Sequence, residues 1–131
     1  VAANDAVAAL ADGLPVTVIR NAHPELGQRE TLRLGVTSSD AAFYLFFPCD
    51  QPFLDAATVR ALVAARREGA IVQPRCCGEP STPVIFSRAF RQEILGLNPG
   101  EHGRDLKTRH PEAVVPVDFD DPRLFMDVDT P

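Results

Sequence analysis

Residues 42–52, which read AFYLFFPCDQP, decide the fold class that this 131-residue sequence predicts. The unbroken apolar run at residues 42–47 is typical of a strand buried on both faces, as in the parallel sheets of α/β proteins. Asp50 would then follow the carboxyl end of that strand, where open α/β sheets bind their ligands. Asp50 is therefore a candidate for holding a metal-bound phosphate, although a carboxylate that shapes the turn or caps the next helix accounts for it equally well.

Helical and strand patterns alternate along the rest of the chain and predict a mostly parallel sheet covered by helices. Asn4 and Asp55 are expected to cap the first helix and the helix after Pro52. The expected strands are residues 16–19, 71–72, 84–86, 114–117 and 124–126, and the other expected helices are residues 30–35, 90–95 and 104–109. A chain of this length fits one α/β domain.

The charge balance argues against a surface for nucleic acid. The formal net charge is -5 at pH 7, and Lys107 is the only lysine, whereas nucleic-acid binding needs clustered positive charge. Arg60, Arg66 and Arg67 on one expected helix fit a solvated face better than a phosphate clamp. We therefore expect no nucleic acid among the partners of this protein.

The three cysteines indicate a reducing compartment, because Cys76 and Cys77 are adjacent and an odd number of thiols makes no tidy disulfide framework. No histidine lies near this pair in the sequence, so a zinc site is not expected. The sequence also shows no apolar run long enough to cross a membrane and no signal peptide. A cytoplasmic protein without membrane contacts is the expectation.

Five short motifs carry a resemblance to a known family. They are Asn21 with Gly27 and TLRLG at residues 31–35, CDQP at 49–52, PVIFS at 83–87, Gly103-Arg104, and DVDTP at 127–131. In this order and spacing they resemble the MobA-like nucleotidyltransferases, which attach a nucleotide to the molybdenum cofactor, and within them the molybdopterin cytidylyltransferases most. The resemblance covers residues 14–131 and implies a three-layer α/β/α, Rossmann-like nucleotidyltransferase fold.

The resemblance implies transfer of CMP from CTP to a phosphorylated pterin, with release of pyrophosphate. Such a reaction needs Mg²⁺, or Mn²⁺ in its place, to neutralise charge on the phosphates. By resemblance Asp50 is the catalytic residue and the main metal ligand, and Asp127 or Asp129 is the second acidic ligand. Exposed acids that alternate with Met126 and Val128 along a strand would also explain this pair. The similarity of the whole DVDTP string to the closing motif of the family favours the ligand role.

The resemblance places residues 21–35 beside the bound nucleotide, with Asn21, Gly27, Thr31 and Arg33 as the binding residues. Gly27 would allow a close approach of the backbone, and the helix start after it offers free N–H groups to an anion. An exposed arginine or a local ion pair explains Arg33 as well. Asn21 is also an ordinary turn residue, so its role in binding depends on the resemblance.

Ser81, Thr82 and Pro83 occupy the loop that the resemblance places near the acceptor substrate. Relatives usually carry a glycine and a histidine or asparagine before the proline, so the identity of the acceptor stays open. GTP in place of CTP is an alternative, which would make the protein a guanylyltransferase or another small-molecule nucleotidyltransferase of the family.

The sequence lacks the glycine-rich loop, with its arginine and lysine, that opens the family domain and holds the triphosphate. We therefore expect residues 1–131 to be one domain, the carboxyl-terminal portion of such an enzyme, and to be inactive alone. Two other hypotheses stay open. One is a non-catalytic fragment that binds a nucleotide or a partner such as a molybdoenzyme, and the other is an α/β domain with unrelated chemistry.

Overall fold

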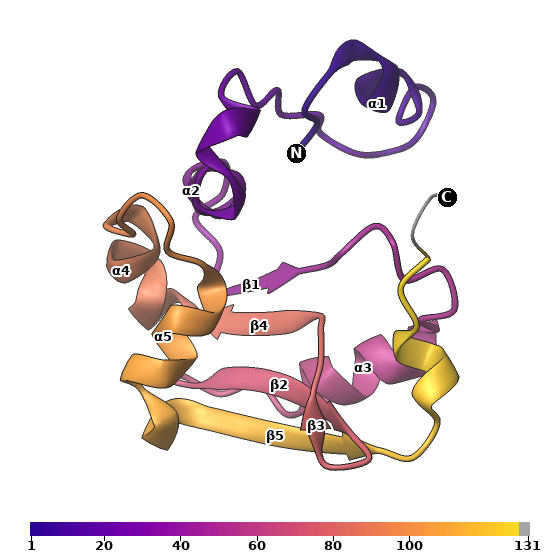
Figure 1. The fold of residues 1–131 in the computed structure, drawn as a ribbon, viewed down its shortest axis with the longest axis vertical. Coiled ribbons are helices and arrows are strands. Elements are labelled where there is room, and N and C mark those ends of the chain that lie inside the picture. The colour runs from indigo at the N-terminus through magenta and orange to yellow at the C-terminus, as the bar shows by residue number, and fades with distance from the viewer. Residues whose placement is uncertain (129–131) are drawn as a thin grey trace. The chain divides into compact units, whose positions relative to one another are not determined.

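The structure is a computed structural model that describes residues 1–128 and divides the chain into two compact units. Unit 1 comprises Val1–Asp40 and Arg91–Arg109, and unit 2 comprises Ala41–Phe90 and His110–Pro131 (Figure 1). Among the helices of residues 1–128, none is long and apolar enough to cross a membrane. The expectation that the chain forms a single domain stays a prediction.

Unit 2 is built around a five-stranded sheet. Its strands are β1 (Phe43–Phe46), β2 (Ile71–Cys76), β3 (Glu79–Pro80), β4 (Val84–Ser87) and β5 (Val114–Phe119). β4 pairs with β1 and β2 in antiparallel fashion, and β2 pairs with β5 in parallel, so β1, β2 and β5 run in one direction (Figure 1). The predicted α/β character is confirmed, and the shared direction of these three strands corresponds to the expected parallel set. The reversed β4 makes the sheet mixed.

The hairpin from β2 to β4 explains the reversed direction of β4. Cys77 and Gly78 both have positive φ, at 53° and 87°, as a tight hairpin turn requires. The chain then returns along β2 first as β3 and, after Ser81, as β4. A connection this short can join only antiparallel strands.

The apolar run that contains β1 is not buried on both faces, contrary to expectation. Tyr44 is buried at 7% exposure, but Leu45 and Phe47 are 37% and 46% exposed. Among the described strands β1 pairs with β4 alone, so it lies at a lateral edge of the sheet. The apolar run identified the strand correctly but not its surroundings.

The core of unit 2 lies between the sheet and helix α3 (Ala56–Ala64). Leu62 of α3 is fully buried against Val72 and Ile85, and Phe43 and Phe119 pack around these three residues. Apolar side chains of β2 and β4 therefore meet the apolar face of α3, which agrees with the expectation of a sheet covered by helices.

Asp55 caps α3 as predicted, because its carboxylate accepts a hydrogen bond of 2.7 Å from the backbone N–H of Thr58. This bond lowers the pKa of the Asp55 carboxyl. A lowered pKa in the folded state means that the stabilisation is complete above the unfolded-state pKa of about 3.9 and is lost as the pH falls through the folded-state pKa.

We expect Asp55→Ala to lower the melting temperature at pH 7 by a few degrees, because one N–H group of the first helical turn loses its partner. The difference from the wild type should vanish in strongly acidic solution, where the carboxyl is protonated in both states. Thermal melts followed by circular dichroism from pH 7 to pH 2 measure both effects. Asp55→Ser is the matched control, since its hydroxyl caps without a titrating charge, and a pH-independent gap for Asp55→Ala would contradict the assignment.

Unit 1 contains four α-helices among its described residues, α1 (Asp5–Ala9), α2 (Gln28–Thr37), α4 (Arg91–Leu95) and α5 (Gly103–Arg109), and the 3₁₀ helix Pro24–Leu26. Asn4 caps α1 through a bond of 2.9 Å to the N–H of Val7, as predicted. Side chains from α2, α4 and α5 form its core. Val36 of α2, Ile94 of α4 and Leu106 of α5 are almost fully buried there.

Two predicted strands are wrong. Residues 16–19 form no strand, because Ala2 and Arg20 make only an isolated bridge there and Val16 and Val18 stay exposed without a neighbouring strand to pair with. Residues 124–126 fall at the end of a 3₁₀ helix, Pro122–Phe125. Asp121 starts this helix by accepting a hydrogen bond from the N–H of Arg123, and a proline in the first turn suits a helix start.

Candidate active site

Asp50 lies beyond the carboxyl end of β1. The carboxyl ends of β2 and β5 lie on this same side of the sheet. Its side chain is exposed. Its backbone carbonyl accepts a hydrogen bond of 2.8 Å from the N–H of Val128, so the end of the described chain runs beside it. The structure therefore brings Asp127, the neighbour of Val128, to the same edge of the sheet as Asp50.

The buried side chain of Gln51 joins three segments at this edge. Its amide nitrogen lies 2.9 Å from Thr82 Oγ1, 3.1 Å from Asp127 Oδ1 and 3.4 Å from the carbonyl oxygen of Phe125. The last two atoms can only accept hydrogen bonds, so the nitrogen end of the amide must face them. Gln51 thereby fixes the carboxylate of Asp127 through a charge-assisted bond.

The carbonyl oxygen of the same amide, Gln51 Oε1, is buried and has no hydrogen-bond partner. An unpaired buried acceptor is costly, and such groups concentrate where function requires them. Sequence reasoning did not select Gln51, because its role depends on contacts with residues more than thirty positions away. Its place directly after Asp50 was the one available signal.

The acids at this edge fit a magnesium ion. Within residues 1–128 no group of three or more histidine, cysteine or acidic side chains is arranged to hold a metal. Mg²⁺ needs only one or two protein carboxylates when phosphates and waters supply its other ligands, and Asp50 and Asp127 can supply two. Asp129, the alternative second ligand, lies outside the described residues together with the end of the DVDTP motif.

A cavity of about 360 Å³ is lined by Phe53, which follows Asp50 in the chain, and by residues from 121–126, which precede Asp127. Phe53, Leu124 and Met126 form its apolar wall, and Asp121 and Arg123 contribute an ion pair of 2.8 Å. The guanidinium of Arg123 holds the pKa of the Asp121 carboxyl below its usual value. This cavity was not predicted, because residues 124–126 were expected to form a strand.

The predicted acceptor loop lies between β3 and β4. Thr82 is brought to the site by its bond to Gln51, and Pro83 is buried. The N–H of Ser81 donates to the carbonyl of Pro74 at 2.8 Å, which continues the hairpin pairing, so its backbone serves the sheet. Of the three candidates, Thr82 is bonded to Gln51, which is itself bonded to Asp127.

The four predicted nucleotide-binding residues lie in unit 1, whereas Asp50, Thr82 and Asp127 lie in unit 2. Asn21 is buried, and its side-chain oxygen accepts a hydrogen bond of 2.8 Å from the N–H of His23, as an ordinary turn residue does. Gly27 precedes α2 with a φ of 74° and open space around its Cα, so backbone conformation is what requires glycine there.

Thr31 and Arg33 both lie on α2. Thr31 is half-buried, and Arg33 makes a two-pronged ion pair with Glu30 at 2.6 and 2.8 Å. The pair lowers the pKa of Glu30 and raises that of Arg33. The guanidinium is thus held by its own helix, which is the local ion pair that the sequence left open, and its role toward a nucleotide stays a prediction.

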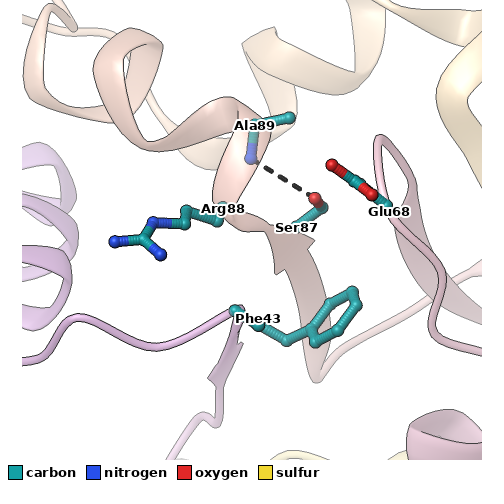
Figure 2. A pocket seen from close by; sticks show the side chains of 6 residues that line it. Phe43, Glu68, Ser87, Arg88 and Ala89 are labelled. Carbon is teal, nitrogen blue, oxygen red and sulfur yellow. Dashed lines mark hydrogen bonds between the residues drawn. The ribbon is translucent and has the colours of Figure 1, made fainter.

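A second cavity, of about 540 Å³, lies at the opposite end of β1 (Figure 2). Phe43, Glu68, Ser87 and Arg88 are among the residues that line it. The Ser87 hydroxyl accepts a hydrogen bond of 3.3 Å from the N–H of Ala89 (Figure 2) and one of 3.0 Å from the N–H of Gly69. None of the lining residues is a histidine, so no imidazole activates this serine. Its hydroxyl fixes the turn between β4 and the next helix.

The fold is a mixed α/β sheet with Asp50 and Asp127 at one end of its strands, and the comparison with protein families gives its class. The model of the MobA-like NTP transferase domain matches residues 1–114, and the chain belongs to this family. The recognised family and the predicted fold class are thereby confirmed.

Two solved structures share the fold. Rv0371c from Mycobacterium tuberculosis H37Rv superposes with a TM-score of 0.73 at 24% identity over 95% of this chain and 65% of its own. Its homologue from Mycobacterium sp. strain JC1 gives a TM-score of 0.63 at 22% identity over 83% of this chain and 55% of its own. The chain thus spans less than two thirds of either structure. Among curated proteins there is no match.

Proposed function

We propose that this chain supplies the metal-binding edge of a Mg²⁺-dependent molybdenum cofactor cytidylyltransferase, which transfers CMP from CTP to a phosphorylated pterin and releases pyrophosphate. The observation that carries the proposal is that the segment of Asp127 runs beside Asp50, since the Val128 N–H donates to the backbone carbonyl of Asp50 and the Gln51 amide donates to the Asp127 carboxylate. Both acids are exposed and therefore open to a ligand. Three free thiols are consistent with the cytoplasm as its compartment.

In this proposal Asp50 and Asp127 hold the divalent cation, with Mn²⁺ as a substitute for Mg²⁺. The cation would neutralise charge on the phosphates during transfer. Gln51 keeps the Asp127 carboxylate in place, so that little reorganisation is needed when the phosphates bind. The neighbouring cavity offers Phe53 and Met126 to the ring of the acceptor and the Asp121–Arg123 pair to its polar edge.

The reaction can be tested with protein expressed from the full reading frame. Pyrophosphate release is measured with CTP, GTP, ATP and UTP, each with molybdopterin as acceptor, and with Mg²⁺, Mn²⁺ or chelator. We expect release from CTP with either metal and none with chelator. Release from GTP alone would show that the protein is a guanylyltransferase and not a cytidylyltransferase. No release from any nucleotide would refute the enzymatic proposal and favour a non-catalytic binding fragment.

Gln51→Leu should raise the Mg²⁺ concentration needed for half-maximal rate by roughly tenfold or more, because residues that orient a metal ligand typically contribute 10- to 100-fold. The substitution removes the N–H donor to Asp127 but keeps a side chain of similar size. Rates measured over a Mg²⁺ titration give the effect.

Gln73→Leu is the matched control for this titration. Gln73 is also buried, and it donates to the carbonyl of Ser81 at 3.3 Å rather than to an acid. We expect its Mg²⁺ requirement to equal that of the wild type. Equal shifts in the two variants would mean that Gln51 acts through stability alone.

A further inference from the structure

Cys76 and Cys77 place two thiols at the tip of the β2–β3 hairpin, outside the site described above. Cys76 is the last residue of β2, and Cys77 begins the turn with its positive φ of 53°. Cys77 is exposed and Cys76 is partly exposed. Their sulfur atoms lie 3.8 Å apart, so the turn presents both thiols together to solvent.

This separation is suited to one atom bound between the two sulfurs. Two bonds of about 2.3 Å from one central atom place their sulfurs about 3.3 Å apart at a right angle and about 4.6 Å apart when linear, and the observed 3.8 Å lies within this range. A direct S–S bond is less suitable, because neighbouring Cα atoms are about 3.8 Å apart and ordinary disulfides need about 4.4 Å or more. The hairpin therefore holds the sulfurs at the spacing of a chelate rather than of a disulfide.

The surroundings of the pair decide which kind of atom it takes. Across residues 1–128 no third histidine, cysteine or acidic side chain completes a metal-binding group with the two sulfurs. A structural zinc site needs four ligands, whereas soft centres are held well by thiolates. Burial, together with Cys77 and the carboxylates of Asp120 and Asp121, raises the pKa of the Cys76 thiol. These acids also favour a bound cation.

We propose that Cys76 and Cys77 form a dithiol site that chelates one soft, thiophilic metal or metalloid centre, of the class of monovalent copper and trivalent arsenic. Copper(I) would displace the two thiol protons and form two Cu–S bonds. With phenylarsine oxide, two As–S bonds form, and the arsenic-bound oxygen leaves as water with both thiol protons. Arsenic stays trivalent, so neither reaction needs an oxidant or a reductant.

The first test uses the reduced chain and phenylarsine oxide under anaerobic conditions. Intact mass should show one adduct, and two of the three thiols should be protected from alkylation. An excess of a monothiol should leave the adduct in place, and 2,3-dimercaptopropanol should remove it. An adduct that a monothiol strips away would refute the chelate.

Single serine variants locate the site. Cys49→Ser is the matched control and should keep the adduct unchanged, because Cys49 lies after β1 and not at the hairpin. Cys76→Ser and Cys77→Ser should each weaken retention of the arsenical by at least about 100-fold, since one thiolate remains. Circular dichroism checks that both variants fold. Full retention in either hairpin variant would overturn the proposal.

A second measurement tests the class of ligand and does not depend on enzymatic activity. Copper(I) and Zn²⁺ are titrated separately against chromophoric chelators. We expect one Cu⁺ per chain that is lost in Cys77→Ser, and no comparable binding of Zn²⁺. Tight Zn²⁺ binding that needs both cysteines would show a harder, four-ligand site and contradict the assignment.

Discussion

Asp50→Asn is expected to lower Mg²⁺-dependent pyrophosphate release by about 100-fold or more, because an amide keeps the shape of the side chain but removes the charge that holds the cation. Asp50 is exposed, so the substitution should leave the fold and the melting temperature unchanged. Initial rates with saturating nucleotide, measured over a range of Mg²⁺ concentrations, separate a loss of metal affinity from a loss of turnover.

Glu68→Gln is the control for this experiment. It also removes one exposed carboxylate from unit 2, but Glu68 lines the cavity at the other end of β1 (Figure 2). We expect its rate to be that of the wild type. If Glu68→Gln lost activity while Asp50→Asn kept it, the active site would lie at the opposite edge of the sheet from the one proposed.

Leu62→Ala should destabilise unit 2 by about 2–5 kcal/mol, the range found when a buried leucine is cut back to alanine in a packed core. Leu62 of α3 has 0% exposure and packs against Val72 and Ile85 of the sheet, so its truncation leaves a cavity lined by apolar side chains. Unfolding in urea gives the free energy. The sequence has one tyrosine and no tryptophan, so Tyr44 in β1 provides a fluorescence signal specific to unit 2.

Leu10→Ala is the comparison variant, because Leu10 is 79% exposed and its truncation should change stability by no more than about 0.5 kcal/mol. Far-ultraviolet circular dichroism, to which the helices of unit 1 contribute, is recorded in the same titration. A loss of less than about 1 kcal/mol in Leu62→Ala would mean that α3 is not packed on the sheet as described.

Local signals predicted those elements whose cause is local. Asp55 predicts the start of α3, because a cap interacts only with the first turn of its helix. The apolar pattern of β4 is likewise complete within four residues. The valines at 16 and 18 have strand propensity, but a strand also needs a partner, and local sequence does not report one. Propensity therefore failed where pairing decides the structure.

In the candidate site too, residues with a local signal could be predicted from the sequence, and residues whose role depends on distant contacts could not. Asp50 was selected as a candidate because it is the first acid after the apolar run that contains β1. The role of Gln51 was not found, since Thr82, Phe125 and Asp127 meet its amide only after the hairpin and the final segment have folded. Arg33 shows the converse, because its partner Glu30 is one helical turn away and local sequence is enough to indicate such a pair.

The parallel pairing of β2 with β5 has a consequence for the order in which unit 2 assembles during synthesis. The β2–β4 hairpin is complete once Ser87 has left the ribosome, whereas β5 begins at Val114, after the second segment of unit 1, Arg91–Arg109, has been made. Contacts close in sequence form faster than distant ones. The nascent chain should therefore carry a hairpin with one open edge until β5 arrives, and this interval is when it most needs protection from strand exchange with other chains.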